Sequence, residues 1–71
     1  MKIINWGHEH FYNDHLMGCV DDIKSPEVMT QVLDILKNNH GLKEDDVVAF
    51  ITTSGMAYIV EKKTLNMEDV I

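Results

Sequence analysis

Three histidines near the N-terminus have the residue type and spacing that best suit metal chemistry. His8, His10 and His15 lie close together in the sequence, and Cys19, the only cysteine of the chain, follows them. Imidazole nitrogens and thiolates are ligands for zinc and other transition metals. These four residues therefore form a candidate metal site, with a transition metal such as zinc as the candidate cofactor. Histidines that are simply exposed to solvent would explain the same pattern.

The geometry of this candidate site depends on the conformation of residues 8–24. On a strand, His8 and His10 would point to the same face, whereas on a helix His15 and Cys19 would become neighbours. A helix would gather one apolar stripe along residues 12–23, but a glycine inside it, Gly18, would cost about 1 kcal/mol relative to alanine. The sequence slightly favours a helix over residues 13–23 and leaves a strand as the alternative.

Cys19 also has the side-chain type of a catalytic nucleophile. Such a nucleophile needs a general base and a site that stabilises an oxyanion, both held in a rigid pocket. A chain of 71 residues has little room for that pocket, and a small buried apolar side chain is the simpler role for a lone cysteine. No catalytic or nucleotide-binding motif is present, so we expect no enzymatic activity.

Carboxylates are the most abundant charged groups of the chain. Twelve acidic residues stand against six basic ones, which gives a formal net charge of −6. Many of the carboxylates are adjacent to one another, and seven of them form a candidate partner-binding surface: Asp21, Asp22, Glu44, Asp45, Asp46, Glu68 and Asp69. An acidic surface attracts a basic protein and repels phosphate backbones and anionic membranes. We therefore expect a basic protein partner, and neither direct nucleic-acid binding nor membrane binding. Carboxylates that only keep the domain soluble are the simpler explanation.

Residues 26–40 give the clearest prediction of an element. Ser25 suits the N-cap, and Pro26 suits the first helical position, where its missing N–H is not needed. Apolar residues occupy one arc of roughly 160° at helical spacing, and polar residues occupy the opposite arc. Gly41 suits the left-handed position that ends a helix. This pattern predicts an amphipathic helix that lies across a sheet.

Two apolar runs over residues 47–62 predict a β-hairpin. The Thr53-Ser54-Gly55 sequence between them fits a three-residue loop that ends in glycine. The first run is apolar on both faces, which indicates a central strand, whereas the second ends in charged residues and is expected nearer the edge. The helix can cover only one face of the hairpin. Residues 11–23, the C-terminal tail or a second copy of the chain must then cover the other face.

Together these elements predict a single α+β domain over residues 1–71. It contains a small antiparallel sheet built on the hairpin and a strand within residues 1–6, with the 26–40 helix packed on one face. A chain this short is marginally stable alone, and one cysteine cannot form an internal disulfide, so we expect a homo-oligomer. No secretory signal is visible, which favours the cytoplasm.

These features favour a small, non-enzymatic, intracellular binding protein that acts as an inhibitor or adaptor. All six basic residues are lysines, and this usage is typical of an AT-rich genome, for example that of a low-GC bacterium or its phage. The alternatives are a metal-binding module built on the histidines and an oligomer that sequesters a small ligand.

Overall fold

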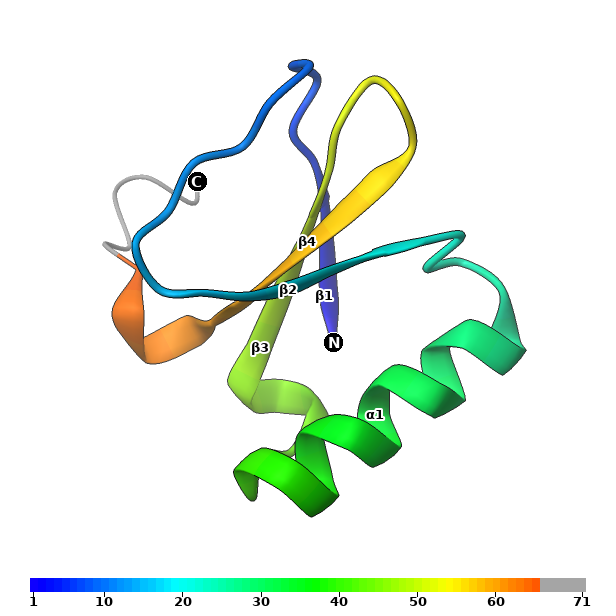
Figure 1. Ribbon diagram of the computed structural model, residues 1–71, viewed down its shortest axis with the longest axis vertical. Coiled ribbons are helices and arrows are strands. Elements are labelled where there is room, and N and C mark those ends of the chain that lie inside the picture. The colour runs from blue at the N-terminus through cyan, green and yellow to red at the C-terminus, as the bar shows by residue number, and fades with distance from the viewer. Residues whose placement is uncertain (66–71) are drawn as a thin grey trace.

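The structure, a computed structural model that describes residues 1–65, is a four-stranded mixed sheet with one helix packed on it. This arrangement confirms the predicted small α+β fold (Figure 1). In chain order the elements are β1 (Lys2–Asn5), β2 (Leu16–Asp21), α1 (Pro26–His40), β3 (Val47–Ile51) and β4 (Met56–Glu61). Two short 3-10 turns, Glu44–Asp46 and Lys62–Thr64, flank the β3–β4 hairpin.

The strand order in the sheet is β1-β3-β4-β2, so β1 and β2 form its two edges. β3 and β4 pair as an antiparallel hairpin, and β2 pairs antiparallel with β4. β1 pairs with β3 in parallel, so the sheet is mixed and not wholly antiparallel as expected. β4 is a central strand, not the near-edge strand that its charged end indicated, because β2 covers its outer side.

The helix α1 spans the predicted residues, Pro26–His40. It ends at Gly41, whose φ of 65° is in the left-handed region that glycine adopts without strain. The Gly41 N–H donates to the Lys37 carbonyl, and the Leu42 N–H donates to the Leu36 carbonyl at 3.1 Å. The bond from Gly41 to Lys37 is that of the αL motif, which ends a helix at a left-handed residue. Within residues 1–65, none of the helices is long and apolar enough to span a membrane.

The core under α1 lies on one face of the sheet. Leu36 is the buried side chain of the helix, and Ile23 in the preceding turn packs beside it. The sheet contributes alternate residues of both hairpin strands, as the period of two requires. They are Val47, Ala49, Ala57 and Ile59.

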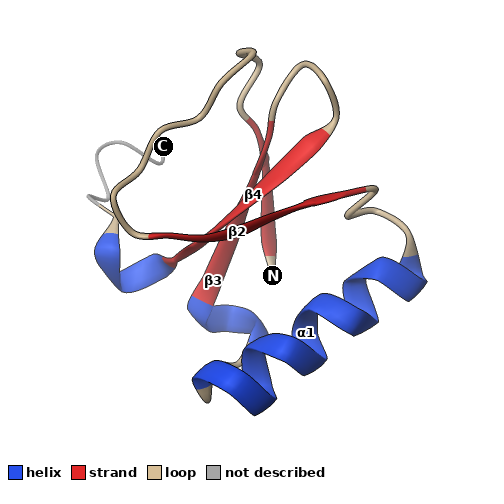
Figure 2. Ribbon diagram, in the orientation of Figure 1, coloured by secondary structure: helices blue, strands red, loops and turns tan. Residues whose placement is uncertain are grey.

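A second core lies on the opposite face of the hairpin, where an aromatic cluster covers Val48 and Val60. The ring of Phe11 stacks on Phe50 with centroids 4.5 Å apart, and Trp6 meets both rings edge-on. Phe11 belongs to the long connection from β1 to β2, drawn as a tan loop in Figure 2. Of the three covers that the sequence leaves open, Phe11 represents residues 11–23 and Leu65 represents the C-terminal tail, and Trp6, which the sequence did not assign to this cover, packs beside them.

The helix that the sequence slightly favours over residues 13–23 is wrong, and the strand alternative is right. β2 pairs with β4 from Leu16 to Asp21, with a bulge between Leu16 and Gly18. The apolar stripe of the helical interpretation does not form a buried face, since Leu16 and Cys19 are exposed. Hydrogen bonding to the outer side of β4 determines the conformation, and this long-range contact overrides the helical spacing of the local sequence.

Candidate functional site

The candidate acidic residues lie in two groups, one beyond each end of α1. Asp21 ends β2 and Asp22 lies in the turn before the helix, whereas Glu44, Asp45 and Asp46 form the 3-10 turn that follows it. A helix of 15 residues is about 22 Å long, so the two groups do not form one cluster. Two further members of the predicted surface, Glu68 and Asp69, lie outside the described residues.

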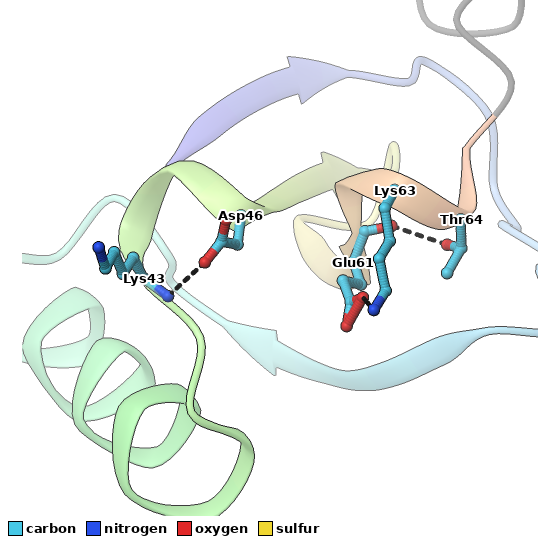
Figure 3. A network of polar contacts seen from close by, with 5 residues as sticks. All are labelled: Lys43, Asp46, Glu61, Lys63 and Thr64. Atoms are coloured by element: carbon cyan, nitrogen blue, oxygen red, sulfur yellow. Dashed lines mark hydrogen bonds and ion pairs between the residues drawn. The ribbon is translucent and has the colours of Figure 1, made fainter.

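Two carboxylates of the second group have partners within the chain. The carboxylate of Asp46 accepts a hydrogen bond from the Lys43 N–H at 2.8 Å and closes the 3-10 turn (Figure 3). The carboxylate of Glu44 lies 2.8 Å from the N-terminal ammonium group. Asp45, like Asp21 and Asp22 at the other end, is exposed. These three side chains are therefore the members of the described set that are best placed to meet a partner.

Charge is distributed unevenly along the described chain. Residues 21–46, which comprise α1 and its two flanking turns, contain seven carboxylates and three lysines. The rest of residues 1–65 contains three carboxylates and three lysines, and so carries no net side-chain charge. The net negative charge of the described side chains thus belongs to the segment 21–46, which we call the acidic helix layer.

The histidines of the candidate metal site lie in a connecting loop and do not surround a common metal position. His8 and His10 lie in the loop after β1, where their carbonyl oxygens accept hydrogen bonds from the Thr53 N–H at 2.9 Å and the Trp6 indole N–H at 3.0 Å. The ring of His8 also contacts Trp6, with centroids 5.2 Å apart. The bond from Thr53 attaches the loop to the tip of the β3–β4 hairpin, whereas the contacts of Trp6 lie within the loop.

The other two candidate ligands lie on or beside β2. The backbone N–H of His15 donates to the Asn13 side chain at 2.7 Å and shapes the turn before the strand. Cys19 lies within the strand, in register with Tyr58 of β4, and is exposed. Among residues 1–65, no three histidine, cysteine, aspartate or glutamate side chains come together as a group that could hold a metal ion. The described structure therefore offers no geometry for the predicted zinc site.

An apolar groove of about 190 Å³ lies between β2 and α1. Figure 1 shows α1 running below β2 in that view. The groove is lined by Met17, Gly18, Cys19, Val20, Val32, Ile35, Leu36, His40 and Ile59. Ile35 is 54% exposed although it belongs to the apolar arc of the helix. The sequence interpretation missed this groove. The apolar arc of the helix was its signal, because the arc is wider than the part of the helix that packs on the sheet.

Two other hollows have mixed polar linings. One, of about 480 Å³, lies where the His8–His10 loop meets the hairpin tip, and its lining includes Glu9, Ser54 and Tyr58. The other, of about 500 Å³, lies beside the Lys62–Thr64 turn. There Lys63 lies 3.2 Å from the buried Oε2 of Glu61, and the Thr64 hydroxyl donates to the Glu61 carbonyl (Figure 3). These contacts stabilise the end of β4 and do not present an arrangement for catalysis.

No protein-family model matches this chain, and no curated protein or solved structure matches it at a significant level. The features of the chain that bear on its function are its charges, its exposed strand and its groove.

Proposed function

We propose that this protein is a small, non-enzymatic binding protein that recognises a basic protein partner through its acidic helix layer. It would act as an inhibitor or adaptor, by occupying a basic surface of that partner. The observation that carries this proposal is the charge distribution. The acidic helix layer has an excess of four carboxylates over lysines, whereas the other described residues are balanced.

This charge distribution has a physical consequence for association. A surface of one sign steers a partner of the opposite sign and raises the association rate, most strongly at low ionic strength. It also disfavours nucleic acids, because their phosphates carry the same sign. The exposed side chains of Asp21, Asp22 and Asp45 have room for the lysine or arginine side chains of a partner. A basic protein, including one that itself handles nucleic acid, has the complementary charge.

Two observations support a binding role over a catalytic one. The candidate nucleophile Cys19 is exposed on an edge strand, whereas a catalytic thiolate needs a general base and a structured pocket. The hollow beside the Lys62–Thr64 turn contains the ion pair of Glu61 with Lys63, and the hollow at the hairpin tip is lined by Glu9, His10 and uncharged side chains. The simplest use of an acidic surface with an adjoining apolar groove is the recognition of another protein.

A charge-matched pair of variants tests the proposal. The immobilised protein is exposed to lysate of a low-GC bacterium, and the retained proteins are identified after elution with increasing salt. We expect a basic protein, whose affinity falls roughly three- to tenfold for Asp21→Asn/Asp22→Asn, because each exposed ion pair contributes up to about 1 kcal/mol. The control, Glu9→Gln/Asp14→Asn, removes two exposed carboxylates outside the acidic helix layer.

Retention that does not depend on salt would contradict the proposal. So would an equal loss of affinity for the two double variants, because overall charge and not a located surface would then determine binding.

A further inference from the structure

The outer side of β2 is an unpaired edge of the sheet. β2 is the last strand in the order β1-β3-β4-β2, and its only strand partner among the described residues is β4. An edge strand presents a row of backbone N–H and C=O groups that can pair with another chain. Extended segments of partner proteins commonly bind to such edges as an additional strand.

The register identifies which backbone groups face outward. Thr52 N–H donates to the Met56 carbonyl, so this pair of the hairpin is hydrogen-bonded. In an antiparallel ladder hydrogen-bonded pairs alternate with non-bonded ones, so the backbone groups of Ala57 and Ile59 turn away from β3 and toward β2.

These two residues pair with Val20 and Gly18 of β2. The backbone groups of Cys19 and Asp21, which alternate with them, therefore point away from β4. The N–H and C=O groups of these two residues are therefore the ones that an added strand could pair with.

The apolar groove lies along this same edge. It is bordered by Met17 and Val20 of β2 and by Val32 and Ile35 of α1. Val20 packs on the α1 side of the sheet, so by alternation Cys19 and Asp21 have their side chains on the other face. A strand added to β2 would direct every second side chain toward the groove and the others toward the face of Asp21.

The charges along the edge specify the chemistry of that added strand. The strand β2 carries one charged side chain, that of Asp21, and Asp22 adds a second carboxylate directly after the strand. The nearest lysine in the sequence, Lys24, lies in the turn that follows. Natural edge strands often carry lysines that discourage pairing, whereas β2 contains no lysine and its one charged side chain is a carboxylate. A second copy of the chain would bring the same carboxylates to the edge, whereas a basic segment would neutralise them.

We propose that the open edge of β2 binds an extended, basic segment of the protein partner as a fifth strand. Alternate apolar side chains of that segment enter the groove between β2 and α1, and the intervening lysines or arginines lie beside Asp21. This inference rests on the proposed function, because it specifies how the basic partner is recognised.

A peptide of alternating lysine and valine residues is the probe. Cys19 is the natural reporter, because it is the only thiol of the chain, is exposed and lies within β2. We expect the peptide to slow alkylation of the Cys19 thiol roughly fivefold at saturation, since an added strand covers this position. The control peptide has the same sequence with N-methylated lysine backbone nitrogens, which keeps its charge but removes the N–H groups that pair with the edge.

Two variants test the groove without disturbing the core. Ile35→Lys places a positive charge on the groove wall at an exposed position, and we expect it to weaken peptide binding roughly tenfold by calorimetry. Asn38→Lys adds the same charge at an exposed helix position that does not line the groove, and we expect a smaller effect, about twofold.

The outcomes separate this inference from the proposed function. Equal protection of Cys19 by the two peptides would overturn strand addition and leave charge recognition standing. If neither peptide binds, strand addition is overturned. A thiol that is already protected in the free protein, together with a dimeric mass by light scattering, would assign the edge to a second copy and overturn the inference.

Discussion

Replacement of Phe11 by alanine should remove much of the stability of this domain. Phe11 lies in the connection from β1 to β2, outside any helix or strand, and is 9% exposed. Its ring stacks on Phe50 at a centroid distance of 4.5 Å and meets Trp6 at 5.3 Å. The face of the hairpin opposite α1 depends on this loop for its cover, so the substitution tests whether the second core is necessary for the fold.

The expected loss follows from the burial of the ring. A buried phenylalanine replaced by alanine costs about 3–5 kcal/mol, which includes the cavity left behind. Phe11 lies on a loop that can partly collapse, so we expect the lower value, about 3 kcal/mol. A domain of 71 residues has a total stability of roughly 4–11 kcal/mol. The substitution therefore removes a large fraction of the free energy of unfolding, and the midpoint of thermal unfolding should fall by roughly 12–24 °C.

The neighbouring aromatic residue provides a matched control. Tyr12 is 87% exposed, and Tyr12→Ala should change the free energy of unfolding by less than about 0.5 kcal/mol. Urea and thermal unfolding of the two variants, followed by circular dichroism, measure the difference. If Phe11→Ala and Tyr12→Ala have the same midpoint within error, the loop does not cover the hairpin and the assignment of the second core is wrong.

Three further predictions concern local features. Gly41→Ala should destabilise the protein by about 1 kcal/mol, because Gly41 has a φ of 65°. Gly18→Ala should be close to neutral, because a Cβ at Gly18 meets no atom within 4 Å. The midpoints of urea unfolding compare the two variants. Thr52→Val should cost about 1 kcal/mol in the same assay, because the buried hydroxyl lies 2.9 Å from the Ser54 hydroxyl. Glu44→Gln should cost less than about 0.5 kcal/mol, because its carboxylate is largely exposed, and thermal unfolding in 1 M salt should abolish even that difference.

The elements that the sequence predicts well are those specified by neighbouring residues. The helix 26–40 has its proline at the start, its apolar arc in the middle and Gly41 at the end, and all of these signals act within one or two turns. The hairpin is equally local, because Gly55, with a φ of 91°, provides the conformation that a three-residue loop requires. The alternation of the hairpin side chains between two faces follows directly, and the two cores confirm it.

The elements that the sequence predicts poorly depend on contacts between distant residues. β2 is a strand because β4 offers its outer backbone groups, and Gly18 fits that pairing although it would weaken a helix. β1 is parallel to β3 because the chain crosses the sheet between β1 and β2, and no local pattern records that path. The placement of the candidate metal ligands depends on the same contacts, since His8 lies in the connection after β1 and Cys19 lies on β2. The acidic residues were found by composition, and the predicted helix 26–40 already separates those at 21–22 from those at 44–46. Their exposure and their partners within the chain needed the fold.

The bulge in β2 limits the length of the open edge. It lies between Leu16 and Gly18 and interrupts the ladder, so the regular part of the edge extends only over residues 18–21. A short, twisted edge is a poor template for aggregation, and the carboxylates of Asp21 and Asp22 oppose pairing with another copy of this acidic chain. A basic strand does not meet that repulsion, and it can add apolar contacts in the groove beside α1. The carboxylates that discourage self-association therefore favour a partner of opposite charge, which is the selectivity that the proposed function requires.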